Sequence, residues 1–327
     1  MVYKLESHPL AFSSSSVYVS ATSRIAHRTK DKSALLNIEL FENETKDDSP
    51  ILLVLHGACA SAETKCVQNI VRAAKSNSVK VAVLELEGHG LSSGERMANG
   101  DFDRHLGHVL EFVQAAVPAL RPLSTTAPYY FAANSLGGVL AIYAAEKISN
   151  DKDSYPFDFK GVAAIAPAVG VDKNKVPSAP ITLGLSLLSY IAPSLQVSLT
   201  PLEDPSSYSC PSGSKRNFSG HWPLITSKML LDVTTFKVKN DLENGMLSLS
   251  STDKVLIFGG VVDKTVPFDT IHTFYSAIRP KKKQLISVGG GHDMMVFKSS
   301  SLEVTNALFE WILLGDAPSS KESITTR

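Results

Sequence analysis

The chain has 327 residues, of which 43% are hydrophobic and 20% are charged. This composition is typical of a globular protein with a sizeable buried core, and it speaks against global disorder. Lysine and arginine together number 32, as do aspartate and glutamate, so the formal net charge is +0. Without a basic surplus, we expect no nucleic-acid partner.

Cysteine content and the amino-terminal segment bear on the cellular compartment. Cys59, Cys66 and Cys210 are too few and too unevenly spaced for a disulfide framework or a zinc site, and they indicate a reducing compartment. The first 30 residues contain a serine run and one acid, Glu6, which faintly resembles a transit peptide, but they contain no apolar segment for secretion. The uncharged stretch 176–202 is interrupted by four prolines, so it is not predicted to span a membrane. We expect a cytoplasmic protein, with association to a membrane surface left open.

Strand and helix patterns alternate along most of the chain. Short apolar runs that end in Gly, Pro or polar residues predict buried strands, and apolar residues at helical spacing predict the helices between them. The expected strands are 51–57, 79–86, 129–135, 161–167, 254–260 and 284–288. The expected helices are 60–77, 101–117, 136–148, 267–278 and 302–312. This order predicts an α/β fold, a mostly parallel sheet with helices on both faces.

The alternation is interrupted between Ala168 and Ser251. This stretch is rich in Pro and Ser and contains two expected helices, near 181–192 and 223–240. Because ligands of α/β proteins bind at the carboxyl edge of the sheet, we interpret the stretch as a helical cap over that edge. The alternative, which composition does not exclude, is an insertion without a role at the site. The predicted core consists of two parts, 1–167 and 252–316, and the cap is the segment 168–251 between them. Residues 317–327 are predicted to form a disordered tail.

A short motif places Ser135 between an expected strand and an expected helix. A serine nucleophile on such an elbow needs small residues two positions before and after it, and Ala133 and Gly137 meet this need. The motif departs from G-x-S-x-G because alanine replaces the first glycine. The alternative interpretation is a serine that only forms a turn.

A nucleophilic serine needs a histidine base, and that histidine needs an acid that fixes its tautomer. Asp263 follows the strand 254–260, and His292 follows the next strand along the chain. The carboxyl ends of parallel strands share one edge, so we expect both side chains near Ser135. Asp269, at a helix start, and Asp293, adjacent to the histidine, are weaker candidates for the acid.

Acyl transfer also needs hydrogen-bond donors for the developing oxyanion. The expected donors are the backbone N–H groups of Leu136, after the serine, and Ala58, after the His-Gly turn. His56 is interpreted as a structural residue of that turn. His105 and His108, three apart on a helix, are interpreted as part of a solvated face rather than a metal site. This chemistry requires no metal and no organic cofactor.

Several motifs resemble those of the monoacylglycerol lipase and lysophospholipase branch of the α/β-hydrolase family. The resemblance extends from about residue 35 to 314 and is carried by the segments LHGACA, EGHGLSSG, NSLGG, GGVVDKTVP and GGGHDMM. It implies a serine hydrolase of esters with a single long acyl chain, with Ser135, Asp263 and His292 as the triad and Ala58 and Leu136 as oxyanion donors.

In this family a pair of short strands precedes the His-Gly turn, and segments 15–23 and 34–42 can supply them. Ala133 and Asn134 depart from the usual glycine and histidine, which puts efficiency and substrate range in question.

The first cap helix is apolar on more than one side. Ile181, Leu185 and Leu188 belong to one stripe, and Leu183 and Leu187 belong to a second. A helix that is apolar on two sides must contact something on both. In a lid, one stripe would line an acyl groove and the other would enter a membrane surface, as the resemblance suggests. The alternative is a helix that is simply buried in the cap.

Two other functions stay open. A proline-iminopeptidase-like aminopeptidase would share the fold and triad, and Glu203 with Asp204 could bind the substrate's free amine. A non-catalytic α/β-hydrolase that binds a ligand or a partner could also retain a triad.

Overall fold

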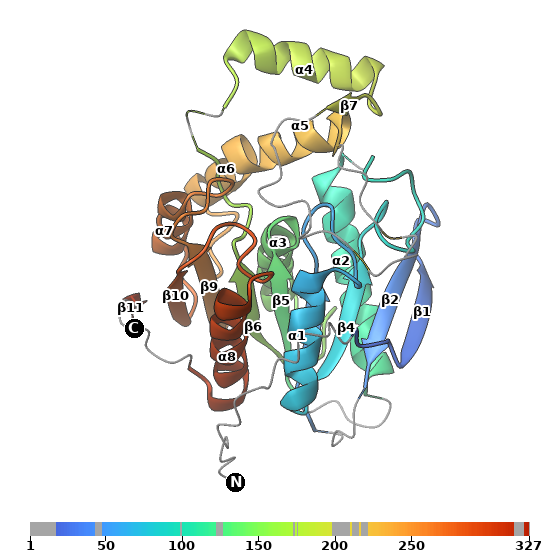
Figure 1. The fold of residues 1–327 in the computed structure, drawn as a ribbon, viewed down its shortest axis with the longest axis vertical. Helices are drawn as coiled ribbons and strands as arrows, with labels where there is room; N and C mark the ends of the chain where they lie inside the picture. The colour runs from blue at the N-terminus through green and yellow to red at the C-terminus, as the bar shows by residue number, and fades with distance from the viewer. Residues whose placement is uncertain are drawn as a thin grey trace.

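The computed structural model describes residues 18–42, 48–98, 100–121, 127–172, 174, 176–197, 210, 216, 222–316 and 324–326. These residues form a nine-stranded sheet in the order β1-β2-β4-β3-β5-β6-β9-β10-β11 (Figure 1). Neighbouring strands from β4 to β10 are parallel, whereas β1, β2 and β11 pair in antiparallel fashion. The predicted mostly parallel sheet with helices on both faces is confirmed.

The elements follow the expected alternation. The strands of the sheet are β1 (Ser23–Arg28), β2 (Leu35–Phe41), β3 (Ile51–Leu55), β4 (Lys80–Glu85), β5 (Tyr129–Asn134), β6 (Phe159–Ile165), β9 (Lys254–Gly260), β10 (Lys282–Val288) and β11 (Ile324–Thr326). The helices of the core are α1 (Lys65–Ser76), α2 (Phe102–Ala119), α3 (Leu136–Asn150), α7 (Phe268–Ala277) and α8 (Lys298–Leu314).

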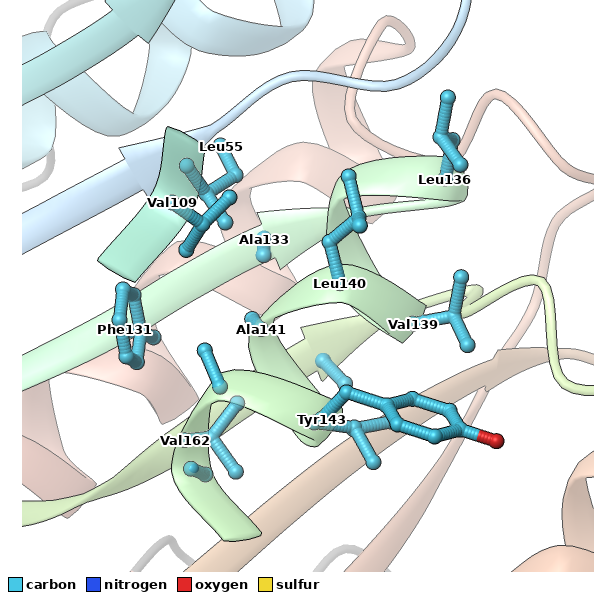
Figure 2. Close-up of a cluster of buried hydrophobic side chains, with 14 of the residues drawn as sticks. Leu55, Val109, Phe131, Ala133, Leu136, Val139, Leu140, Ala141, Tyr143 and Val162 are labelled. Carbon is cyan, nitrogen blue, oxygen red and sulfur yellow. The ribbon is translucent and has the colours of Figure 1, made fainter. Parts of the chain in front are cut away.

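Two helical layers cover the sheet because each central strand is apolar on both faces. In β3, Leu53 and Leu55 belong to the buried cluster that includes α2, α3 and α7, whereas Leu52 and Val54 belong to the cluster of α1 and α8. Figure 2 shows the first of these clusters where α3 lies over Phe131 of β5. A strand buried on both sides has no room for polar residues, so polar chemistry is restricted to the strand ends.

The insertion after β6 supplies a second set of helices. They are α4 (Ala179–Ile191), α5 (Leu224–Asp232), a π-helical turn η3 (Val233–Lys237) and α6 (Val238–Glu243), with the short pair β7 (Gln196–Val197) and β8 (Trp222–Pro223). Figure 1 shows α5 lying across the end of the core and α4 lying outside α5. The hydroxyl of Thr226 in α5 donates to the carbonyl of Met97, in the loop after β4, which ties the cap to the carboxyl edge of the sheet.

The structure differs from the sequence predictions at both ends of the chain. Residues 15–17 of the expected strand 15–23 lie outside the described residues, and 18–22 are not in a strand. The first described strand is 23–28, because a turn at 29–34 sets its pairing with β2: the Thr29 N–H donates to the Ala34 carbonyl, 3.0 Å away. Within the expected disordered tail, 324–326 pair with β10 as the edge strand β11. Backbone groups along β10 are open on that side, so an extended segment of any polarity can pair there.

Candidate active site

Ser135 lies on a strained turn between β5 and α3. Its backbone has φ 52° and ψ −115°, a conformation that a residue other than glycine adopts at a cost of roughly 1–3 kcal/mol. The Ser135 N–H donates to the Ile165 carbonyl at 3.0 Å, and its carbonyl accepts from the Ala168 N–H at 3.0 Å. The end of β6 and the start of the insertion therefore hold the serine in this conformation.

Small residues allow the turn to pack closely. A Cβ at Gly137 would lie 2.5 Å from the His56 carbonyl oxygen, so no larger residue fits without moving backbone. Ala133 is fully buried and lies in the cluster between β5 and α3 (Figure 2). Its methyl group is accommodated in this cluster, so the departure from glycine at position 133 leaves the elbow intact.

The structure brings together the three residues expected to form the triad. The distance from His292 Nε2 to Ser135 Oγ is 3.0 Å, and the distance from His292 Nδ1 to Asp263 Oδ2 is 2.9 Å. Ser135 and His292 are separated by 157 residues in the sequence. With Nδ1–H donating to the carboxylate, Nε2 is left to accept the serine proton.

Both carboxylate oxygens of Asp263 have hydrogen-bond partners. Asp263 Oδ1 accepts the backbone N–H groups of Thr265 and Val266, each at 2.8 Å, and the carboxylate side chain is fully buried. The two loops that carry acid and base pack directly together: the Val262 N–H donates to the Gly290 carbonyl at 3.2 Å. The two supporting N–H donors were not foreseen from the sequence, because they depend on the turn after Asp263.

The segment expected to stabilise an oxyanion lies against the serine. A Cβ at Gly57 would be 3.1 Å from Ser135 Cβ, which places the turn with Ala58 directly beside the nucleophile. Leu136 is the first residue of α3, where an N–H has no acceptor within the helix. The structure therefore places Leu136 and the turn that contains Ala58 beside Ser135, and stabilisation of an oxyanion by their N–H groups stays a prediction. We refer to residues 57–64 as the oxyanion turn.

His56 is buried in the structural position expected for it. Its Nε2 accepts the Leu86 N–H at 3.1 Å, so Nδ1 carries the proton that is donated to the Gly57 carbonyl at 2.7 Å. Burial lowers the pKa of His56 to about 4 and that of the neighbouring His89 to about 3. Both rings are therefore neutral at pH 7 and stabilise the loops that follow β3 and β4.

The expectation for His105 and His108 is wrong. Both side chains are buried on the inner face of α2, with exposed fractions of 1% and 3%, and do not form a solvated face. Helical spacing alone does not distinguish a polar residue on the buried face from one on the exposed face, and here the ring of His105 packs against that of His108 at 6.3 Å. Burial lowers the pKa of His108. Within the described residues no group of three or more His, Cys, Asp or Glu side chains could hold a metal ion.

The cap helix α4 is not buried, which rules out the alternative of a helix enclosed within the cap. Exposed fractions are 62% for Leu183, 61% for Leu187 and 78% for Ile191. Among the described elements, the helix packs against α5 (Figure 1). None of the described helices has an apolar stretch long enough to cross a bilayer.

Comparison with known proteins extends these observations. Residues 47–297 match the family described as serine aminopeptidase, S33. The fold is similar to that of a monoacylglycerol lipase from Paleococcus ferrophilus, with a TM-score of 0.64 and 18% identity over 85% of this chain and 98% of that one. It is also similar to a soluble variant of monoglyceride lipase from Saccharomyces cerevisiae, with a TM-score of 0.67 and 14% identity over 92% and 98%.

A third similar structure is that of Est1E from Butyrivibrio proteoclasticus with bound ferulic acid, with a TM-score of 0.57 and 19% identity over 86% of this chain and 95% of that one. At these identities the likeness concerns the fold. No curated protein sequence matches the chain.

Proposed function

The chain belongs to the serine aminopeptidase, S33 family and is an α/β-hydrolase of the serine-hydrolase type, and on that premise we propose that it hydrolyses carboxylic esters of a single long acyl chain. Monoacylglycerols and lysophospholipids are the proposed substrates. The observation that carries the proposal is the hydrogen-bonded series Ser135, His292 and Asp263, with distances of 3.0 and 2.9 Å.

The proposed reaction begins with attack of Ser135 Oγ on the ester carbonyl carbon while His292 Nε2 takes the serine proton. The N–H groups of Ala58 and Leu136 stabilise the oxyanion of the tetrahedral intermediate. Collapse of this intermediate breaks the ester C–O bond, and His292 returns the proton to the departing alcohol. Water then gives up a proton to His292 and attacks the acyl-enzyme, which releases the fatty acid and regenerates Ser135. Asp263 orients the imidazole throughout.

Two lines of support favour a long acyl chain. Two of the similar structures carry the names monoacylglycerol lipase and monoglyceride lipase. Apolar side chains also lie close to the triad in the sequence and remain exposed: Val261 at 52%, Val262 at 63%, and Phe297, after the histidine loop, at 50%. An acyl chain that covers such side chains would gain roughly 25 cal/mol for each Å² of apolar surface removed from water.

We also propose that the cap contacts a lipid surface through α4. The helix contains no charged residue, and Leu183, Leu187, Tyr190 and Ile191 are all more than half exposed. A large exposed apolar patch on a helix is typical of an interaction surface, and the proposed substrates are themselves lipids. Replacing Leu183, Leu187 and Ile191 by serine should abolish flotation with phosphatidylcholine vesicles, whereas L314S, which changes an equally exposed leucine on α8, should not.

Steady-state kinetics also test the contact between α4 and a lipid surface. The triple serine variant should raise KM for monoacylglycerol presented in vesicles and leave kcat for a soluble short-chain ester unchanged, because the triad lies in the core. Equal flotation of the variant and the wild-type protein would contradict the proposed lipid contact.

An aminopeptidase is the second candidate, and the description of the matching family favours it. Such an enzyme needs acids in the cap to bind a free amine, and the expected pair Glu203 and Asp204 lies outside the described residues. Turnover of a long-chain monoacylglycerol and of a proline arylamide by the same preparation separates the two. Faster turnover of the arylamide would replace the ester proposal.

A fluorophosphonate probe tests the serine-hydrolase chemistry itself. The wild-type protein should be labelled, and Ser135→Ala should not be labelled although its circular dichroism is unchanged. A matched variant, Ser276→Ala, removes an exposed serine hydroxyl of α7 away from the triad and should still be labelled. Failure to label folded wild-type protein would favour a non-catalytic protein that binds a ligand or a partner.

A further inference from the structure

Arg216 of the cap insertion is buried against the core. Its side chain is 2% exposed, and its guanidinium group lies near three carboxylates. Arg216 Nη2 is 2.6 Å from Glu39 Oε1, Nη1 is 3.3 Å from Glu63 Oε1, and Nε is 3.6 Å from Glu85 Oε1. The side chains of Glu39 and Glu85 are fully buried, so Arg216 compensates charges that water does not reach.

Two of these carboxylates are tied to the oxyanion turn. Glu85, at the end of β4, accepts the Ala62 N–H through Oε1 at 3.0 Å and the Leu91 N–H through Oε2 at 2.7 Å. Glu63 belongs to the turn, and its N–H donates to Ser61 Oγ at 3.3 Å. The guanidinium group therefore connects the cap to the segment that immediately follows the Ala58 N–H.

A second residue of the insertion contacts the same turn. Cys210 Sγ lies 3.5 Å from Ser61 Oγ, and Ser61 is fully buried. The cap thus touches the oxyanion turn at two positions, through residues on either side of 211–215.

The turn needs such support because its backbone is strained. Cys59, the residue after Ala58, has φ 69°, a left-handed conformation that a residue other than glycine keeps only when neighbouring groups enforce it. An oxyanion donor acts only when its N–H is within hydrogen-bond distance of the developing charge, and small displacements reduce its effect. Contacts that fix residues 61–63 therefore bear on the position of the Ala58 N–H.

We propose that Arg216, a residue of the cap, is a positioning residue of the oxyanion turn. By binding Glu63 of the turn and Glu85 of β4, it holds the turn in the reactive geometry. The inference rests on the proposed function, because an oxyanion is what the turn would stabilise. It makes the cap part of the catalytic geometry and not only a cover: displacement of the cap would release Arg216 and loosen the donor.

The test compares Arg216→Gln and Arg216→Lys with Lys239→Gln, which removes an exposed cap cation that pairs with Glu243 on the surface of α6. With a soluble p-nitrophenyl ester, R216Q should lower kcat by about 10- to 100-fold with KM nearly unchanged, since a misplaced donor weakens the transition state and not the ground state. R216K keeps the charge but not the three-way guanidinium contact, and should fall between R216Q and the wild-type protein. K239Q should match the wild type.

A second readout distinguishes positioning from a general loss of structure. The affinity of R216K for an alkyl boronic acid, a transition-state analogue that adds to the serine, should fall by the same factor as kcat, whereas affinity for the fatty acid product should not change. R216Q removes the cation that lies beside the buried Glu85, although Glu39 keeps its pairing with Arg24. If R216Q does not fold, R216K decides the question alone.

Three outcomes overturn the proposal: wild-type kcat in either folded variant, an increase in KM with kcat unchanged, or equal loss of affinity for the boronic acid and the product. If the wild-type protein neither hydrolyses esters nor reacts with the fluorophosphonate, the proposed function itself is wrong and this inference falls with it.

Discussion

Replacement of Asp263 by asparagine tests the orientation of the triad most directly. The N–H groups of Thr265 and Val266 both donate to Asp263 Oδ1 at 2.8 Å, so the amide oxygen of an asparagine must take that place. The amide NH₂ then faces His292 Nδ1, which must accept a hydrogen bond and carry its proton on Nε2 instead. In that tautomer Nε2 cannot take the proton of Ser135.

The size of the effect follows from the alternative orientation. Turning the amide so that its oxygen faces His292 would leave the N–H groups of Thr265, which is half-buried, and Val266, which is buried, opposite an NH₂, at roughly 1–3 kcal/mol for each unsatisfied donor. The reactive tautomer is therefore disfavoured by about 2–6 kcal/mol, which corresponds to a loss in kcat of about 30-fold to 2 × 10⁴-fold at 1.4 kcal/mol for each factor of ten.

The assay is steady-state hydrolysis of a soluble ester by Asp263→Asn, with Asp269→Asn in the first turn of α7 as the control that leaves the triad untouched. D263N should keep the melting temperature within a few degrees of the wild type, because the two N–H groups retain their acceptor. If folded D263N keeps more than about a tenth of the wild-type kcat, Asp263 does not fix the tautomer and the reasoning fails.

Further predictions concern stability. Burial lowers the pKa of His56 to about 4 and that of His89 to about 3, from 6.5 in the unfolded chain, so the unfolded state takes up protons first as the pH falls. The free energy of unfolding in urea should therefore be largest above pH 6.5 and should decrease towards pH 4, by about 3 kcal/mol for each histidine; equal values at pH 7 and pH 4 would contradict their burial as neutral rings. Gly137→Ala should prevent folding or lower stability by several kcal/mol because its Cβ would meet backbone at 2.5 Å, while Gly184→Ala in the exposed helix α4, with no atom near, should be neutral or slightly stabilising by thermal melting. Ala133→Gly should lower the free energy of unfolding by about 1–2 kcal/mol through loss of a buried methyl and added backbone freedom, with kcat within about twofold of the wild type; a large gain in kcat would show that alanine limits the elbow.

The positions of Asp263 and His292 were predictable because they follow from a rule of topology. Each residue comes directly after an apolar run that only a buried parallel strand explains, and the carboxyl ends of such strands meet at one edge. The identity of the acid depended on the same rule, since Asp269 begins a helix that leads away from that edge.

Other features could not be predicted from the sequence because they depend on contacts between distant segments. Periodicity placed His105 and His108 on a helix but did not show that their face packs inward, where both are almost fully buried. The starting residue of β1 depended on the turn at 29–34 and on pairing with β2, neither of which a propensity for extended structure determines.

The sequence alone determined the order of strands and helices, the chemistry available at the strand ends and the small residues around Ser135, because these are local properties of apolar runs and turns. Only the tertiary structure decided which groups meet: the 3.0 Å approach of His292 to Ser135, the two N–H donors on Asp263, and the contact of Arg216 with Glu63 and Glu85. The physical reason is that such contacts join segments far apart in the chain, and their distances are set by how the sheet, its loops and the cap pack together.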